Sequence, residues 1–265
     1  MLQIDNYLYA SSLTEAYNTL QSVPGSVVLG GCGYIRLGAR SISTAIDLSN
    51  LDLNFVRDTG SAIEVGAMTT LRSFETNPTM TRLANGVLKS AVENIVGVQL
   101  RNCVTIGGTV AGRYPFSDPL TALLALDTEL QFVNHGRVSL EEYLSGKGYK
   151  DILEKIIIPQ DDRSAAFTSI RKSKTDYAVL NVAVAKNADN YRIVVGSRPG
   201  KAMLSTDAAD YLTQNGLDDK SAAEAGRLAA EQLQFGDNPR GSGEYRKAVC
   251  PVLITRALTE VMHAA

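Results

Sequence analysis

Apolar and polar positions along this chain follow two different periods, and the changes between them predict short strands interspersed with amphipathic helices. Ser12-Leu13-Thr14-Glu15 forms a capping box ahead of an apolar-periodic segment, which predicts a helix over about residues 13–21. Short β-rich segments separated by Asn, Asp and Gly turns follow at residues 27–29, 45–48, 55–57 and 63–65. The N-terminal part is therefore expected to be α/β.

The middle of the chain continues this mixture as far as a polar stretch at residues 160–164. Helical patterns cover residues 79–92 and 119–126, and a strand is expected at 129–133. Ser139-Leu140-Glu141-Glu142 forms a second capping-box pattern, and Leu153 to Ile158 is typical of a buried strand closed by Pro159. The polar stretch predicts a domain boundary, which gives domains 1–163, with parts of about 1–55 and 56–163, and 164–265.

The last hundred residues have a simpler pattern. Two β-branched runs, 177–185 and 191–197, are joined by Lys186-Asn187-Ala188-Asp189-Asn190 and predict an antiparallel hairpin. Segments rich in Ala, Leu and Glu at helical spacing then cover 206–214, 219–234 and 243–263. These predict an α+β fold that ends in a small antiparallel sheet with a three-helix bundle.

Two glycine motifs carry the clearest functional signal. Val27-Val28-Leu29 runs directly into Gly30-Gly31-Cys32-Gly33, and the stretch from Gln99 to Ala111 is expected to contain a β-branched strand that ends in Gly107 and Gly108. Glycines after a strand leave backbone N–H groups unshielded, which suits a pyrophosphate. One such pair is usually an ordinary turn. Two pairs about 80 residues apart predict one dinucleotide held from two sides.

Composition narrows the function classes. The chain has 265 residues, of which 45% are hydrophobic and 20% charged, so it can bury one substantial core and a smaller second one. A formal net charge of −2 supplies no overall attraction for nucleic acid or an anionic membrane. The longest apolar runs fall well short of the roughly 20 residues that cross a bilayer, and no basic region followed by an apolar one opens the chain. A cytoplasmic location is expected.

The chain offers little chemistry of its own. Its three cysteines, Cys32, Cys103 and Cys250, include no CxxC pair, which argues against disulfides, a zinc site or an iron–sulfur cluster. The two histidines, His135 and His263, give neither metal-ligand spacing nor the base of a nucleophilic triad. The chemistry must therefore come from a cofactor.

The order of these motifs resembles a known family. A Gly-Gly loop near the N-terminus, then Arg101-Asn102-x-x-Thr-Ile-Gly-Gly-x-x-Ala, then Ser117-Asp118-Pro119-Leu120 and an aliphatic helix, is similar to the FAD-binding subunit of the molybdenum hydroxylases, such as xanthine dehydrogenase and carbon monoxide dehydrogenase. The resemblance extends through residues 152–159 and 171–176 to Tyr245-Arg246. It implies a two-part α/β FAD-binding domain of the vanillyl-alcohol-oxidase/PCMH type, followed by the sheet and helical bundle.

The resemblance also implies which residues bind FAD. The first phosphate loop is matched by Val27, Val28, Leu29, Gly30, Gly31, Cys32, Gly33 and Tyr34, and the second by Thr105, Ile106, Gly107, Gly108 and Thr109. Cys32 stands where threonine or serine is common in the family, and Thr109 replaces the usual asparagine. The first change removes a hydroxyl that could contact phosphate, whereas the second keeps a hydrogen-bonding group.

Three further positions are matched singly. Asp118 matches an aspartate that accepts hydrogen bonds from ribityl or ribose hydroxyls, although Asp118-Pro119 could equally be the N-cap and N1 of a helix. Leu153 matches a strand beside the isoalloxazine, and it would also serve as an ordinary core residue. Arg171 falls where many relatives place a lysine near the flavin; the alternative is an exposed loop arginine, with the match shifted to Lys172 or Lys174.

By this resemblance, the chain is expected to be the electron-transferring subunit of a heteromeric enzyme. A molybdopterin-binding catalytic subunit and a subunit with two-iron iron–sulfur clusters would be its partners, and NAD or another acceptor would receive the electrons from FAD. Two alternatives stay open: a free-standing FAD-dependent oxidoreductase, and a scaffold subunit that has lost FAD. A Rossmann NAD protein is disfavoured, because Gly31-Cys32-Gly33 lacks the third glycine and the acidic residue of that motif.

Overall fold

The computed structural model describes residues 1–264 and confirms the mixed helix-and-sheet class. By its contacts, the chain forms two compact units, each discontinuous in sequence. The first comprises residues 1–74, 98–112 and 128–158, and the second comprises residues 75–97, 113–127 and 159–265. Residues 75–97 and 113–127 thus group with the C-terminal part of the chain.

The first unit begins with a small parallel sheet. Its strand order is β1 (Gln3–Tyr9), β3 (Ser41–Asp47) and β2 (Val27–Leu29), and both pairings are parallel. The predicted helix is confirmed as α1 (Leu13–Ser22), whose N-cap Ser12 accepts a hydrogen bond from the Glu15 N–H. A 3₁₀ turn, η1 (Ile35–Leu37), follows the first glycine loop. In a parallel sheet the carboxyl ends of all strands meet at one edge, and here Tyr9 and Leu29 both lie opposite Asp47.

A five-stranded sheet makes up the rest of the first unit. Its order is β4 (Val56–Asp58), β5 (Ala62–Gly66), β8 (Leu153–Pro159), β6 (Glu129–Phe132) and β7 (Gly136–Ser139). The helices of this region are α2 (Leu71–Thr76), α5 (Val98–Arg101), α6 (Ile106–Gly112) and α8 (Leu140–Ser145). Ser139 caps α8 by accepting a hydrogen bond from the Glu142 N–H, as its capping box predicts. The central strand β8 confirms the buried strand expected at Leu153–Ile158.

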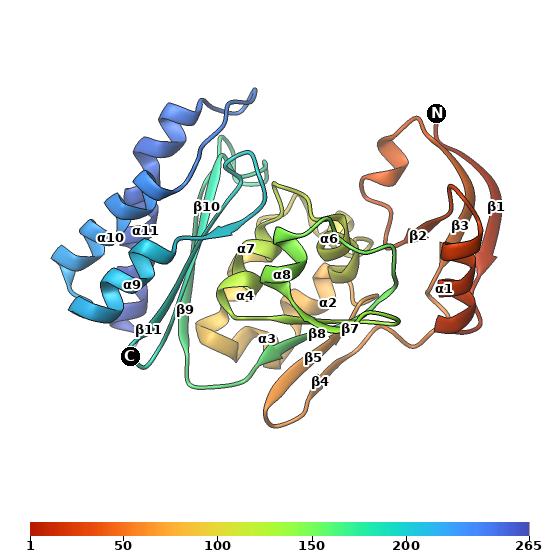
Figure 1. The fold of residues 1–265 in the computed structure, drawn as a ribbon, viewed down its shortest axis with the longest axis horizontal. Helices are drawn as coiled ribbons and strands as arrows, with labels where there is room; N and C mark the ends of the chain where they lie inside the picture. Colours follow the sequence, from red (N-terminus) through yellow and green to blue (C-terminus); the bar gives the residue numbers. More distant parts are fainter. Residues whose placement is uncertain (265) are drawn as a thin grey trace. The chain divides into compact units, whose positions relative to one another are not determined.

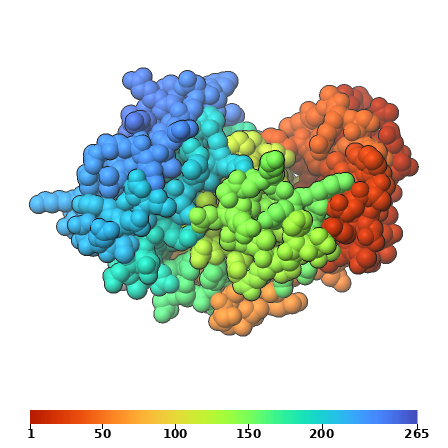
Figure 2. Space-filling model, in the orientation of Figure 1, coloured from red at the N-terminus to blue at the C-terminus, as the bar shows by residue number. Residues whose placement is uncertain are grey.

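The second unit is built on an antiparallel sheet of order β12 (Met203–Leu204), β11 (Asn190–Gly196), β10 (Leu180–Asn187) and β9 (Ser164–Ile170). The predicted hairpin is confirmed as β10 and β11, whereas β9 and β12 were not anticipated. The three predicted helices are confirmed as α9 (Thr206–Asn215), α10 (Asp219–Gln232) and α11 (Gly243–His263). Figure 1 shows them together on one side of β10 and β11, and α9 and α10 form the cyan to light-blue surface in Figure 2.

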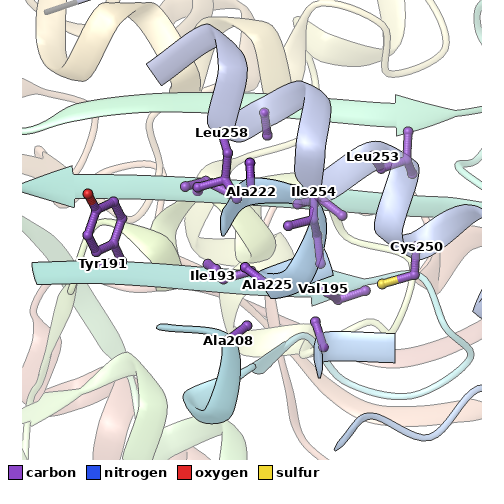
Figure 3. Close-up of a cluster of buried hydrophobic side chains, with 14 of the residues drawn as sticks. Tyr191, Ile193, Val195, Ala208, Ala222, Ala225, Cys250, Leu253, Ile254 and Leu258 are labelled. Atoms are coloured by element: carbon purple, nitrogen blue, oxygen red, sulfur yellow. The ribbon is translucent and has the colours of Figure 1, made fainter. Parts of the chain in front are cut away.

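The core of the second unit lies between these helices and one face of the sheet. Alternate residues of β10 and β11 point toward the helices, as the two-residue period of a strand requires. Figure 3 shows Ile193 and Val195 of β11 beneath Ile254 and Leu258 of α11, with small alanines of α10 beside them. Ile193, Ile254 and Leu258 are fully buried, so this apolar face holds the bundle on the sheet.

The opposite face of the same sheet carries helices from the middle of the chain. They are α3 (Pro78–Arg82), a 3₁₀ turn η2 (Leu83–Gly86), α4 (Val87–Val92) and α7 (Asp118–Ala125). α7 contacts β10 and β11, and α4 contacts β9. The helical pattern over 79–92 is confirmed as α3, η2 and α4, and Ala84 and Asn85, with φ values of +45° and +60°, interrupt it. Every residue of α7 is buried, so this helix is core on all sides.

Candidate functional site

The first glycine loop begins where β2 ends. Gly31 and Cys32 have φ values of +72° and +55°, so the chain turns sharply through the left-handed region immediately after the strand. None of the backbone N–H groups of residues 30–33 donates a hydrogen bond within the part of the chain that the structure describes. All four residues are partly exposed. This loop therefore offers a row of uncommitted donors to an anionic group.

The second glycine loop differs from its prediction. The β-branched strand expected before Gly107 is wrong: Val98–Arg101 forms α5, Thr105 makes only an isolated bridge to Thr70, and the glycines lie in the first turn of α6. The Gly107 N–H donates to the Ala67 carbonyl at 2.9 Å, and the Gly108 N–H donates to Thr105 Oγ1 at 3.1 Å. The donors of this loop are thus already used within the first unit.

The two glycine loops lie against each other, backbone on backbone. A Cβ atom on Gly31 would lie 2.0 Å from the Cys103 carbonyl oxygen, and one on Gly108 would lie 2.6 Å from the Gly30 carbonyl oxygen. A Cβ on Gly107 would lie 2.4 Å from the Ala67 carbonyl oxygen. Because these neighbours are backbone atoms, no side chain can move to make room. The glycines are required for the loops to touch, whatever the loops bind.

Polar side chains adjoin the first loop at the carboxyl edge of the parallel sheet. The Tyr7 hydroxyl donates to the Asp47 carboxylate, and this hydrogen bond raises the pKa of Tyr7 to about 12. Burial and the negative charge of Asp47 together raise the pKa of the Cys32 thiol, which stays neutral near pH 7. Neither Tyr7 nor Asp47 was anticipated. The sequence analysis predicts no strand around Tyr7, whereas Asp47 lies in the β-rich segment 45–48.

Asp118 lies in a buried polar cluster of the second unit. Arg171 Nη2 donates to Asp118 Oδ2 at 2.7 Å, and the Asn181 amide donates to Oδ1. Thr121 Oγ1 in turn donates to Asn181 Oδ1 at 2.9 Å. Burial raises the pKa of Asp118, and the guanidinium and the amide oppose that rise. Both carboxylate oxygens therefore already have donors within the unit.

The two alternatives considered for Asp118 and Arg171 are wrong in detail. Ser117 is the N-cap of α7, so Asp118 is its first helical residue rather than its cap. Arg171 is not an exposed loop arginine, because only 8% of its side chain is exposed and its Nη1 donates to the Asp176 carbonyl at 2.7 Å. In this structure the two residues form an ion pair with each other.

Leu153 opens β8 in the first unit. It is 5% exposed and lies opposite Phe132 of β6, at the β-bulge between Gln131 and Phe132. Its side chain packs as the core leucine that the alternative interpretation describes. Gly30–Gly33, Thr105–Thr109 and Leu153 all belong to the first unit, whereas Asp118 and Arg171 belong to the second.

Across residues 1–264, no three His, Cys, Asp or Glu side chains gather as a metal site would require. No helix in that range is both long and apolar enough to cross a membrane. Cys32, Cys103 and Cys250 are all free thiols.

Comparison with known proteins identifies this arrangement. Residues 2–161 match the model of the FAD-binding domain in molybdopterin dehydrogenase, and residues 165–261 match the C-terminal domain of the carbon monoxide dehydrogenase flavoprotein. The chain therefore belongs to the FAD-binding flavoproteins of the molybdopterin dehydrogenases. Within that family it is an FAD-binding medium subunit of the molybdenum hydroxylase type.

Individual relatives can be aligned with most of the chain. It is 27% identical to the nicotine 6-hydroxylase medium subunit of Paenarthrobacter nicotinovorans over 96% of both chains. It is 30% identical to the uncharacterized protein YgfM of Escherichia coli K12, over 83% of this chain and 81% of that one. Its fold superposes on a chain of reconstituted CO dehydrogenase from Oligotropha carboxidovorans with a TM-score of 0.90, at 21% identity and 99% coverage of both. The suspected family, the fold class and FAD as the cofactor are thus confirmed.

Proposed function

We propose that this chain is the electron-transferring FAD subunit of a heteromeric molybdopterin-dependent oxidoreductase. A molybdopterin-binding subunit would oxidise the substrate, an iron–sulfur subunit would carry the electrons, and FAD held here would pass them to NAD or another acceptor. The chain's own residues would bind and orient the cofactor and shield it from water, because the cofactor supplies the redox chemistry.

One observation carries this proposal: the four consecutive N–H groups of Gly30, Gly31, Cys32 and Gly33 have no acceptor among residues 1–264, and they lie against a second glycine loop. A pyrophosphate needs several donors and close approach of the backbone, and both are present here. The residues therefore fit FAD. The second loop supports the first through the contact between Gly30 and Gly108, while its own N–H groups stay bonded to Ala67 and Thr105.

We assign the cofactor contacts accordingly. The phosphates would be bound by residues 27–34 and 105–109. The N–H groups of the first loop would be the donors, and Thr105 and Thr109 of the second loop would lie beside that loop. Leu153 would pack near the flavin ring, as the family resemblance implies. Asp118 and Arg171 would act as an ion pair, so a cofactor hydroxyl near Asp118 would have to share a carboxylate that Arg171 and Asn181 already occupy.

The test replaces Cys32, the one residue of the first loop that carries a side chain at a positive φ. Cys32→Asn and Cys32→Asp have the same shape, and both residue types tolerate the left-handed region. At about 6 Å and an effective dielectric constant of about 20–40, an added carboxylate repels a phosphate charge by about 1.4–2.8 kcal/mol. Cys32→Asp should therefore bind FAD at least tenfold more weakly than Cys32→Asn.

Binding is measured by titrating the apo chain with FAD and following flavin absorbance and fluorescence. Equal affinities of the two variants would place the phosphates elsewhere, and a folded wild-type chain that binds no FAD would favour the scaffold alternative. The free-standing alternative is distinguished by anaerobic reduction: an electron-transfer subunit takes electrons from an artificial donor, whereas a free-standing enzyme is reduced by an organic substrate without partner subunits.

A further inference from the structure

One methionine of the second unit lies at the surface beside a buried arginine. Met203 is 47% exposed and belongs to β12, a two-residue strand at the edge of the antiparallel sheet. Its partner across the strand pair is Val195, which is fully buried. Arg198 Nη2 donates a hydrogen bond to the Met203 sulfur. Neither Met203 nor Arg198 belongs to the glycine loops or to the Asp118–Arg171 ion pair, so the proposed function assigns no role to this contact.

The arginine is a buried cation without a carboxylate partner. Only 7% of Arg198 is exposed, and no Asp or Glu pairs with it among residues 1–264. Its Nε has no acceptor in that range, and burial lowers the pKa of the guanidinium. Buried donors without acceptors and buried charges without partners both cost free energy. The surroundings of Arg198 therefore lack a strong acceptor.

Other contacts hold the guanidinium in place. Arg198 Nη1 donates to the Gln234 carbonyl at 2.6 Å, just after the end of α10. The Arg198 carbonyl accepts a hydrogen bond from the Gly236 N–H at 2.7 Å. A cation near the C-terminus of a helix is favoured by the helix dipole. Arg198 thus links the turn between β11 and β12 to the end of α10, and its Nη2 reaches only the Met203 sulfur among residues 1–264.

Oxidation would turn this weak acceptor into a strong one. The thioether sulfur of methionine accepts hydrogen bonds weakly, whereas the oxygen of a sulfoxide carries partial negative charge and accepts them well. Conversion of methionine to its sulfoxide usually disrupts packing, because it places a polar group in apolar surroundings. At Met203 the new oxygen would be bonded to the sulfur that Arg198 already contacts. The usual cost is therefore expected to change sign here.

We propose that Met203 is a site of reversible oxidation by hydrogen peroxide, and that Arg198 binds the oxygen of the resulting sulfoxide. The sulfur attacks one peroxide oxygen, so that an S–O bond forms and the O–O bond breaks. The transferred oxygen gives its proton to the departing hydroxide, which leaves as water. The sulfur is oxidised by two electrons, and the peroxide is reduced by the same two. Methionine sulfoxide reductases reverse the modification.

The proposed function would itself generate the oxidant. Flavins take part in the chemistry of dioxygen, and a reduced flavin that reacts with dioxygen releases hydrogen peroxide. The modification does not depend on this source, because peroxide from solution also reaches an exposed methionine. The inference therefore goes beyond the proposed function and can be tested separately from it.

The first experiment locates the oxidation. The full chain, with FAD bound, is treated with limiting hydrogen peroxide, and the added oxygen is mapped by mass spectrometry of its peptides. Met203 should be oxidised at least tenfold faster than Met80, which is fully buried and serves as the internal control. The apo chain should give the same order. Equal rates at the two methionines would overturn the proposal.

The second experiment tests whether Arg198 binds the new oxygen. Oxidation should raise the melting temperature of the wild-type chain by about 3 °C or more, because it adds a hydrogen bond to a charged group. The same treatment of Met203→Leu should give no rise, which controls for oxidation at other methionines. In Arg198→Leu, oxidation should lower the melting temperature. A fall in the wild-type chain would overturn the proposal, whether or not Arg198→Leu folds.

A pair of substitutions repeats the test without peroxide. Met203→Gln supplies a carbonyl oxygen on an unbranched side chain, whereas Met203→Leu supplies no acceptor. The difference in melting temperature should favour Met203→Gln by about 3 °C or more in the wild-type background relative to the Arg198→Leu background. The same difference in both backgrounds would refute binding by Arg198. FAD content is read separately from flavin absorbance, so failure of this proposal is distinguishable from failure of the proposed function.

Discussion

Contact between the two glycine loops can be tested by comparing two glycines that share a backbone conformation. Gly31 and Gly136 both have φ +72°. A Cβ on Gly136 would meet nothing within 4 Å, whereas one on Gly31 would lie 2.0 Å from the Cys103 carbonyl oxygen. Gly136→Ala should therefore lower the free energy of unfolding only by the left-handed backbone cost of about 1–2 kcal/mol. Gly31→Ala has the same backbone cost, and in addition the backbone around Cys103 must shift to make room for the new Cβ.

The second cost can be bounded from the geometry. The Cβ and the carbonyl oxygen must separate by more than 1 Å to reach ordinary contact, and overpacking of this kind costs about 1–3 kcal/mol. Gly31→Ala should thus lower the free energy of unfolding by about 1–3 kcal/mol more than Gly136→Ala does. In a chain of this size that difference shifts the melting temperature by roughly 2–12 °C.

The assay is urea and thermal denaturation of the apo chain, followed by far-UV circular dichroism. The apo form is essential, because bound FAD would stabilise the loops by mass action and confuse the two effects. If Gly31→Ala is no less stable than Gly136→Ala, the loops do not touch as described, and the shared phosphate site loses its geometric basis.

Two further predictions concern buried groups. At pH 8 a thiol reagent should label exposed Cys103 in the native chain and leave Cys250 unlabelled until denaturation. Burial raises the pKa of the Cys250 thiol from 9.0 to about 12. The neutral thiol therefore contributes its full stabilisation below about pH 9, and this contribution is lost as the pH rises toward 12. Cys250→Ala should remove this pH dependence, which is measured by comparing urea unfolding midpoints at about pH 8 and about pH 10.5. Asp118→Asn should cost about 3 kcal/mol or more by urea denaturation, because it leaves the Arg171 charge buried and unpaired, whereas Glu231→Gln on exposed α10 should leave the midpoint unchanged.

Signals confined to a few residues of sequence predicted local structure well. The caps at Ser12 and Ser139 depend on a bond to the N–H three residues later, and both helices begin where the sequence indicates. The hairpin of β10 and β11 likewise depends on two β-branched runs and a polar turn between them. In each of these cases, the interaction that forms the structure is made between residues of the same short motif.

The second glycine loop shows where such a pattern fails. Val104-Thr105-Ile106 has the composition of a strand, yet Ile106 begins a helix. The Ile106 N–H donates to the Thr69 carbonyl and the Gly107 N–H to the Ala67 carbonyl. Those partners lie 37 and 40 residues earlier in the chain, so tertiary bonding overrides local propensity here.

For the same reason, the sequence did not show which segments of the chain make up the second unit. Asp118 and Arg171 are 53 residues apart, and their ion pair brings the start of α7 to the end of β9. The family resemblance assigned them separate contacts with the cofactor, because a motif match says what residue type stands at a position and not which partner it has. The polar stretch at 160–164 marks a turn in the chain, but helices from both sides of it cover the sheet.

The two glycine loops carry different weight as indicators of a cofactor. In the second loop, glycine is required by contacts with Ala67 and Gly30, and the N–H groups are consumed inside the protein. A chain that had lost FAD would still need those glycines in order to fold. In the first loop, the N–H groups of residues 30–33 have no acceptor among the described residues, and folding alone does not explain them. The first loop is therefore the better indicator, and the pair Cys32→Asn and Cys32→Asp tests it without disturbing the glycine contacts.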